Sequence, residues 1–260
     1  MLYLLVLLVV PTLGVWLFMQ QPTFGKKTAN GRLARIKKSP NYRNGAFQNQ
    51  SHTPNLAEGT SPWDIVKAYF NLPKDREPAQ PIPSVKTDLK TIPADVPTIV
   101  WFGHSSYLIK IAGKSILVDP VFSGNASPVA FFGKNYEGSN VYSVDDMPEI
   151  DVLLITHDHY DHLDYDTVTK LRPKVKQVVA SLGVGAHLES WGYDAQNIRE
   201  LDWNDVAEVA GFTLTALPAR HFSGRGFKRN QTLWSSFALK GAGYTLYLGG
   251  DSGYDEHFKA

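Results

Sequence analysis

The sequence predicts a mixed α/β (α+β) protein in which two β-sheets pack face to face and helices cover the outside. Short apolar segments rich in Val, Ile and Leu recur over residues 98–248 and are separated by turn residues, as in strands joined by hairpins. Few helical segments lie between them. Most of the apolar surface must therefore be buried between sheets, with the helices packed outside.

The expected strands begin with one long strand over 98–111, where apolar and polar residues alternate along most of the segment, followed by a hairpin partner over 115–118. The apolar run 151–156 predicts a buried strand. Asp164 is a suitable N-cap for a helix over 165–171. The remaining expected elements are strands over 175–181, 198–203, 207–217 (with a turn at 210–211), 232–239 and 244–248, and a helix over 183–191.

The composition is that of a folded globular protein, with 43% hydrophobic and 20% charged residues in a chain of 260. This length is sufficient for one large core or two small ones. A net charge of +1 provides no overall attraction to nucleic acid, so we expect no nucleic-acid partner. The absence of cysteine excludes disulfides, thiolate metal ligands and a cysteine nucleophile.

The first 19 residues carry no charged side chain and predict a membrane-spanning helix. At about 1.5 Å per residue, such a helix is roughly 28 Å long, just enough to cross a bilayer. A cleaved signal peptide and a buried soluble helix are the alternatives. The lack of a basic leader and of a small-residue cleavage site after Met19 favours the anchor. We therefore expect a transmembrane anchor over residues 1–20.

Residues 21–97 are rich in Pro, Asn, Gln and Lys, and we expect a basic arm that wraps over the domain, with one short helix over 63–72. Residues 1–60 hold seven Lys or Arg and one acidic residue, and the basic residues all follow the apolar segment. This order favours a cytoplasmic location for the C-terminal domain, and a periplasmic or extracytoplasmic location is the alternative. Residues 98–260 form the predicted domain.

A cluster of metal-binding residue types lies directly after the buried strand, in the order His-x-His-x-Asp-His. His157 and His159 point the same way in extended backbone, so both can bind one metal ion. Asp161 and His162 follow as the chain turns and can serve a second ion. Imidazole and carboxylate ligands suit zinc, and manganese or iron also accept them. The alternative is a polar loop of solvated histidines, which this density of ligands after a buried strand disfavours.

Two further strand ends carry one potential ligand each, namely His221 and Asp251. Either residue alone is compatible with an ordinary loop or turn position, but a shared site needs ligands from several strand ends. His104 lies within the first expected strand and is a candidate to support the site or to face the substrate, with a structural hydrogen bond as the alternative. His52 and His187 are interpreted as structural or solvated, and His257 is a weak ligand candidate.

Together these residues resemble the metallo-β-lactamase superfamily. More narrowly, the chain is similar to the N-acyl-phosphatidylethanolamine phospholipase D-like branch, near the ascorbate-lactonase-like hydrolases. The resemblance covers roughly residue 40 to the end and implies an αββα sandwich with two metal ions at the sheet edges. Outside the metal motif, the matching segments are 41–49, 101–106, 118–123, 218–223, 229–230 with 233–234, and 249–254.

Carried over residue by residue, the resemblance implies one zinc ion held by His157, His159 and His221. It implies a second zinc ion held by Asp161 and His162, with Asp251 bridging and a hydroxide between the metals as the nucleophile. Asp161 and Asp251 are therefore the expected catalytic residues. The expected substrate contacts, listed together, are His104, Arg225 and Arg229.

The chain departs from the family pattern in two places. Lys228 stands before the Arg229-Asn230 pair, where family members commonly have Asp. The family also supplies a last histidine ligand well downstream of the Gly-Asp strand, whereas this chain stops at Ala260. The expectation is a domain that is incomplete at its C-terminus, with an under-ligated second metal as the alternative.

The expected function is that of a membrane-anchored dinuclear zinc hydrolase, a phosphodiesterase of phospholipase D type that acts on a phospholipid-like substrate. A lactonase or other ester hydrolase on the same metal site is one alternative. A non-catalytic, membrane-tethered scaffold of the same fold is another. The expected partners are a lipid or small-molecule phosphodiester and a membrane, and the sequence makes no prediction of oligomeric state.

Overall fold

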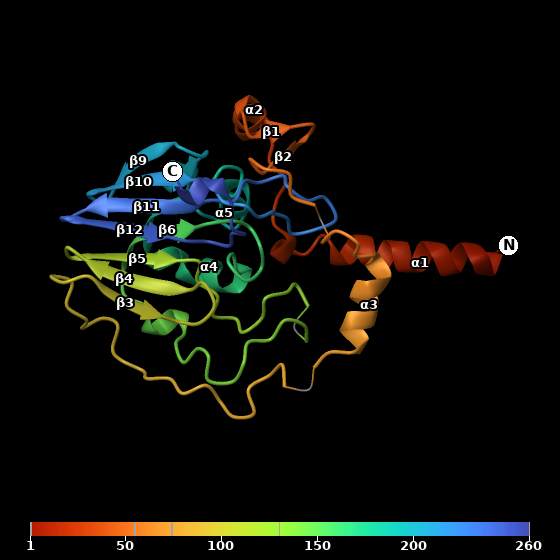
Figure 1. Cartoon of the computed structure of the whole chain (residues 1–260), viewed down its shortest axis with the longest axis horizontal. Coiled ribbons are helices and arrows are strands. Elements are labelled where there is room, and N and C mark those ends of the chain that lie inside the picture. The colour runs from red at the N-terminus through yellow and green to blue at the C-terminus, as the bar shows by residue number, and fades with distance from the viewer. Residues whose placement is uncertain (1, 55, 74, 130, 260) are drawn as a thin grey trace.

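Two β-sheets form the centre of the molecule (Figure 1). The computed structural model describes residues 2–54, 56–73, 75–129 and 131–259. The larger sheet has the strand order β3-β4-β5-β6-β7-β8 and the smaller has the order β12-β11-β10-β9. Strands β5 to β8 are parallel, so their carboxyl ends meet at one edge of the larger sheet. The predicted mixed α/β class is confirmed.

Most elements lie near their expected ranges, but residues 98–111 form two strands and the strand expected over 232–239 begins only at Ser236. The larger sheet consists of β3 (Thr98–Trp101), β4 (Tyr107–Ile111), β5 (Lys114–Val118), β6 (Ile150–Ile155), β7 (Val175–Ser181) and β8 (Ile198–Leu201). The smaller sheet consists of β9 (Val206–Val209), β10 (Phe212–Leu217), β11 (Ser236–Gly241) and β12 (Tyr244–Leu248). The helices are α1 (Leu2–Phe18), α2 (Asn30–Lys38), α3 (Pro62–Phe70), α4 (Tyr165–Leu171) and α5 (Gly185–Ser190), and a short ribbon pairs β1 (Tyr42–Arg43) with β2 (Ala46–Phe47).

The core is layered because alternate residues of the larger sheet point to opposite faces. Val152 and Leu154 of β6 pack between the two sheets, against a layer that includes Phe237 of β11. Leu153 and Ile155 point the other way and pack with Val168 of α4 and other residues of the helix layer. Every residue of β6 is buried, as predicted for this strand. The layers helix, sheet and sheet correspond to three of the four expected for an αββα sandwich.

The single strand predicted over 98–111 is wrong, because it is two antiparallel strands. Trp101 at the end of β3 pairs with Tyr107 at the start of β4. Between them, Gly103 and His104 have φ angles of 99° and 47°, which reverse the chain and cannot continue a strand. The predicted helix over 165–171 is confirmed, and the Asp164 side chain accepts a hydrogen bond at its N-terminus.

The N-terminal helix α1 extends away from the sheets in Figure 1. None of the helices in the described part of the chain combines the length and the apolar character that a membrane span requires. The helix ends at Phe18, and a 3₁₀ turn that begins at Pro22 follows. The structure therefore does not support the transmembrane anchor predicted over 1–20.

Part of the segment predicted as an arm lies against the domain. Ile36 of α2 and Phe47 of β2 are fully buried in a cluster with Trp203 and Trp234. The helix α3 matches the predicted helix over 63–72 and begins with a capping box. The helix α2 was not predicted, because its short polar sequence shows little apolar periodicity. Ile36 packs against the domain, and Arg32 of the same helix pairs with Glu189 and Glu200.

Candidate metal centre

The histidine-rich motif occupies the loop that connects β6 to α4. Because β6 is a buried parallel strand, its chain emerges at the carboxyl edge of the larger sheet, where ligand sites of open α/β sheets lie. The loop turns at once, since the amides of His162 and Leu163 both donate to the carbonyl oxygen of His159. This turn separates the first two histidines from Asp161 and His162, as the sequence predicted.

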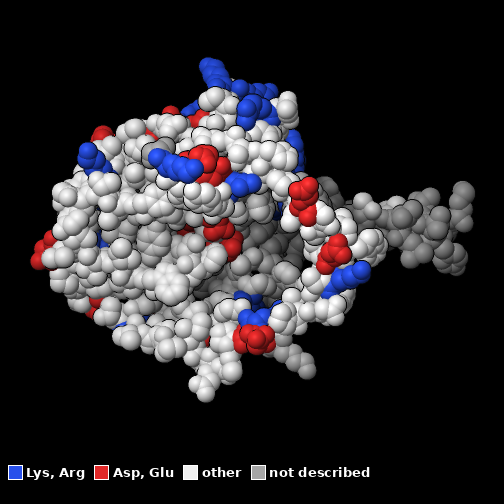
Figure 2. All heavy atoms as spheres, viewed as in Figure 1, with Lys and Arg blue, Asp and Glu red and all other residues white. Residues whose placement is uncertain are grey.

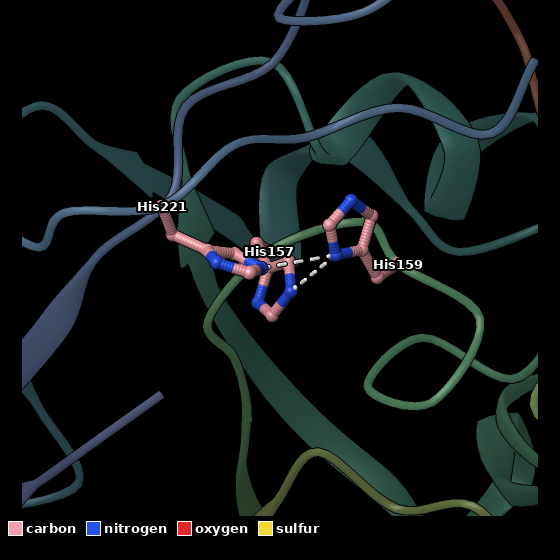
Figure 3. A group of neighbouring side chains, drawn as sticks. All are labelled: His157, His159 and His221. Carbon is pink, nitrogen blue, oxygen red and sulfur yellow. Dashed lines mark hydrogen bonds between the residues drawn. The ribbon is translucent and has the colours of Figure 1, made fainter. Parts of the chain in front are cut away.

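The first donor set consists of His157, His159 and His221, whose imidazoles converge (Figure 3). His159 Nδ1 lies 2.9 Å from His157 Nε2 and 3.2 Å from His221 Nε2. A tetrahedral zinc ion with Zn–N bonds of about 2.0–2.1 Å places its donor atoms about 3.3–3.4 Å apart. The three imidazole nitrogens therefore have spacings that suit one zinc ion.

The second donor set consists of His104, Asp161, His162 and Asp251, and its ligand atoms all lie within 4.8 Å of one another. His104 Nε2 is 3.1 Å from Asp161 Oδ2, and His162 Nε2 is 3.3 Å from Asp251 Oδ1. The other oxygen of Asp251 lies 3.5 Å from Nε2 of His221, which belongs to the first donor set. Asp251 thus faces both donor sets, as expected of a bridging carboxylate.

A buried carboxylate, Asp119, orients His162. Its Oδ2 lies 2.8 Å from His162 Nδ1 and accepts from the Thr156 hydroxyl at 2.6 Å. Its Oδ1 accepts from the Thr156 amide at 2.8 Å. His162 Nε2 consequently points toward Asp251, yet it is buried and forms no hydrogen bond within the described residues. A buried polar atom without a partner is costly, and a metal ion is the partner that this donor set fits.

The charges of the site favour metal binding. Burial and the neighbouring histidines hold the pKa of His157 well below its usual value, and burial lowers the pKa of His221 to about 4. Burial raises the pKa of Asp161, but the hydrogen bond from His104 and the charge of His162 outweigh it and lower that pKa to about 2. Near neutral pH these groups are therefore neutral imidazoles and an ionised carboxylate, the forms that bind metal.

His162 differs from the first donor set. Burial lowers its pKa, but the hydrogen bond with the Asp119 carboxylate and the negative charge of Asp251, 3.3 Å from Nε2, outweigh this effect and raise the pKa to about 10. Without a metal ion the imidazole therefore carries a proton near neutral pH, and a metal ion must displace that proton.

The protein-family model described as the beta-lactamase superfamily domain matches residues 114–260 of this chain. These residues include all members of the two donor sets except His104, six of seven. The chain belongs to the metallo-β-lactamase superfamily. It is 40% identical over 228 residues to an uncharacterized protein of Mycobacterium tuberculosis (85% of this chain, 60% of the relative). It is 31% identical over 254 residues to N-acyl-phosphatidylethanolamine-hydrolyzing phospholipase D 1 of Caenorhabditis elegans (91% of this chain, 68% of the relative). A UPF0173 metal-dependent hydrolase of Saccharolobus solfataricus is 31% identical over 163 residues (61% of this chain, 63% of the relative).

These matches confirm the predicted superfamily and the resemblance to its phospholipase D-like members. The chain spans about 60% of the length of the mycobacterial relative.

Two supporting residues were not predicted from the sequence. The side-chain amide of Asn49 accepts a hydrogen bond from the His221 amide at 3.1 Å and donates one to the His221 carbonyl at 2.8 Å. Asp158 is buried within the metal motif, where it accepts from the Gly224 amide at 2.6 Å and lies 3.3 Å from His187 Nε2. Because Asp158 lies between His157 and His159 in the sequence, a supporting role at the site could have been predicted for it. The side-chain partners of Asn49 depend on contacts between distant segments.

Arg225 does not take the predicted role of substrate contact. Its side chain is buried, and the guanidinium donates to the carbonyl oxygens of Thr23, Asp158 and Leu163 at 2.7–2.9 Å. These contacts tie the segment before α2 to the metal-binding loop and leave the charge enclosed in the protein.

Arg229, by contrast, is exposed and lies 4.8 Å from the centre of the Phe222 ring. That ring in turn contacts the His159 imidazole, with 4.5 Å between ring centroids. Arg229 therefore lies beside a ring that contacts the first donor set. His257, the weak ligand candidate, belongs to neither donor set within the part of the chain that the structure describes.

Proposed function

We propose that this chain is a metal-dependent hydrolase with two zinc ions, and that its substrate is a phosphodiester of phospholipid type. The observation that carries the proposal is the position of Asp251, whose two carboxylate oxygens face the two donor sets at 3.3 and 3.5 Å. A carboxylate in this position suits a pair of ions a few Å apart. Manganese or iron would also accept these ligands.

When bound, two zinc ions would supply a nucleophile from water at neutral pH and would stabilise negative charge that develops on the substrate. The protein's part is to present the donors in the right protonation state and direction. His157 and His221 have lowered pKa values and remain neutral, while Asp161 remains ionised. Asp119 holds His162 so that Nε2 faces the centre. Asp161 and Asp251 are the proposed catalytic carboxylates.

The phospholipid-like substrate is supported by the relative of Caenorhabditis elegans, whose name describes a phospholipase D that hydrolyses N-acyl-phosphatidylethanolamine. Arg229 is exposed beside Phe222, where a guanidinium can contact a phosphate oxygen. Figure 2 shows the molecule hollowed between the body of the sheets and the segment that carries α3, and β6 points toward this hollow in the same view. The hollow is a suitable entrance for a substrate with a large headgroup or chain.

Attachment to a membrane is a separate proposal. It is supported by the exposed apolar side chains of α1, among them Val10, Trp16 and Leu17, and by the basic residues between Lys26 and Arg43 that follow them. The same order of charges favours the cytoplasmic side for the catalytic domain. Flotation of the chain with phospholipid vesicles, compared with a variant that begins at residue 21, tests the attachment.

Metal content and hydrolysis together test the function. We expect about two zinc ions per chain and cleavage of bis-p-nitrophenyl phosphate. Asp251→Asn should abolish cleavage and weaken zinc binding, because the amide is a poorer ligand for both ions. The control Glu256→Gln changes an exposed carboxylate whose partner in the structure is Lys259, and it should behave as the wild type. Cleavage of a lactone in place of the phosphodiester would reassign the substrate, and a folded chain without metal would refute the hydrolase.

A further inference from the structure

We infer that His104 is a direct ligand of the second metal ion, beside Asp161, His162 and Asp251. This inference rests on the proposed two-metal centre and states that His104, one of the residues in the second donor set, binds the ion directly. The sequence indicated only a supporting or substrate-facing role for this histidine. The assignment comes from where the turn between β3 and β4 places the imidazole.

The donor atoms have the spacing of a shared ion. His104 Nε2 lies 3.1 Å from Asp161 Oδ2, close to the separation of about 3.3 Å between ligand atoms on a tetrahedral zinc ion. The rings of His104 and His162 approach edge to face, with centroids 5.1 Å apart and planes at 73°. His104 therefore belongs to a compact group of four donors whose ligand atoms all lie within 4.8 Å of one another.

The backbone of the turn is built to hold His104 in this place. His104 is not glycine, yet it adopts a φ of 47°, a sparsely populated conformation that recurs at active sites as well as in turns. Gly103 has a φ of 99°, and a Cβ there would lie 2.9 Å from the carbonyl oxygen of Ser139. The Trp101 indole donates to the His104 carbonyl at 2.8 Å and fixes the turn from the side.

The same turn is tied to the backbone of Asp119, whose carboxylate orients His162. The Ser106 hydroxyl donates to the backbone carbonyl of Asp119 at 2.6 Å, and the Ser106 amide donates to the carbonyl of Gly103. His104 and His162 are thus positioned through one connected set of hydrogen bonds. This connection suits two imidazoles that must face one ion.

His104→Ala tests the assignment through metal binding. The side chain is 54% exposed, so its removal should leave the fold intact. We expect the affinity for the second ion to fall about 100-fold or more, since the loss of a supporting residue alone costs 10- to 100-fold. The first ion should remain, giving about one zinc per chain. If the wild type binds two ions and the variant also binds two with unchanged affinity, His104 is not a ligand.

A cysteine at position 104 distinguishes a metal ligand from a residue that only contacts the substrate, because only a ligand gives a spectroscopic signal with the bound metal. The chain has no cysteine, so a thiolate-to-cobalt charge-transfer band can arise only from an introduced residue. We expect this near-ultraviolet band when His104→Cys is loaded with Co²⁺, and none with the neighbouring control Ser105→Cys. Absence of the band in a His104→Cys protein that has bound two cobalt ions overturns the assignment. A wild-type chain that takes up a single ion would overturn the two-metal centre itself, which is a distinguishable result.

Discussion

Replacement of Asp119 by Asn should weaken the second metal ion without removing any ligand. Asp119 is fully buried, and its Oδ2 lies within hydrogen-bonding distance of both His162 Nδ1 and the Thr156 hydroxyl. Oδ1 accepts from the Thr156 backbone amide at 2.8 Å, so in Asp119→Asn the amide oxygen keeps that place and the NH₂ takes the place of Oδ2. The NH₂ cannot accept a hydrogen bond from His162 Nδ1. The neutral His162 then places its proton on Nε2, the atom that must bind the metal.

The expected loss is about 10- to 100-fold in affinity for the second ion, or about 1.4–2.7 kcal/mol at 1.4 kcal/mol per tenfold change. The first ion should be affected much less, because within the described residues no ligand of the first donor set forms a hydrogen bond with Asp119 and only His157 is linked to it, through the Thr156 hydroxyl. Competition with a chromophoric chelator near neutral pH resolves the two binding steps, and metal per chain confirms them. In the metal-free variant, the pKa of His162 should also fall from its raised value.

Asp151→Asn is the matched control for this variant. Asp151 is a buried carboxylate at the opposite end of β6, where it accepts from the Ser115 amide at 3.0 Å and pairs with Lys176. Both variants should lose stability, by about 1–3 kcal/mol, but the control should keep both ions. Equal metal affinity in the two variants would show that Asp119 serves only the stability of the sheet edge, and the reasoning about the His162 tautomer would be refuted.

Three further predictions concern stability, the first ion and pH. Arg225→Met should lower the free energy of unfolding by about 2–4 kcal/mol, because it leaves buried carbonyl oxygens without donors. The control Arg229→Met, at an exposed position, should change this free energy by less than about 0.5 kcal/mol. Denaturant titrations measure both values. Asn49→Ala removes both hydrogen bonds that hold the backbone of His221, so zinc should bind less tightly to the first donor set, and unchanged affinity by chelator competition would contradict this. Because the pKa of His162 is raised to about 10, binding of the second ion should release about one proton near neutral pH, and this binding should weaken as the pH falls. Calorimetry in buffers of different ionisation enthalpy measures the proton release. If no proton is released, the imidazole of His162 is not protonated in the metal-free protein.

The sequence alone determined the parts of this protein that depend on neighbours along the chain. The run of apolar residues before the metal motif predicted the buried strand β6, and Asp164 predicted the start of α4. The spacing of His157, His159, Asp161 and His162 predicted two groups of donors, because backbone geometry fixes where residues two apart point. The superfamily followed from the same residues, and the comparisons confirm it.

Only the tertiary structure decided which distant residues meet. It brought His104 to Asp161 and Asn49 to His221, and it buried the Arg225 side chain that the sequence placed at the substrate. Periodicity and motif spacing carry no information on such contacts, since they arise when separate segments pack against one another and satisfy their buried polar groups. The single strand predicted over 98–111 was wrong for the same reason. Its alternation of residue types continues through a turn whose positive φ angles are fixed by contacts with the rest of the chain.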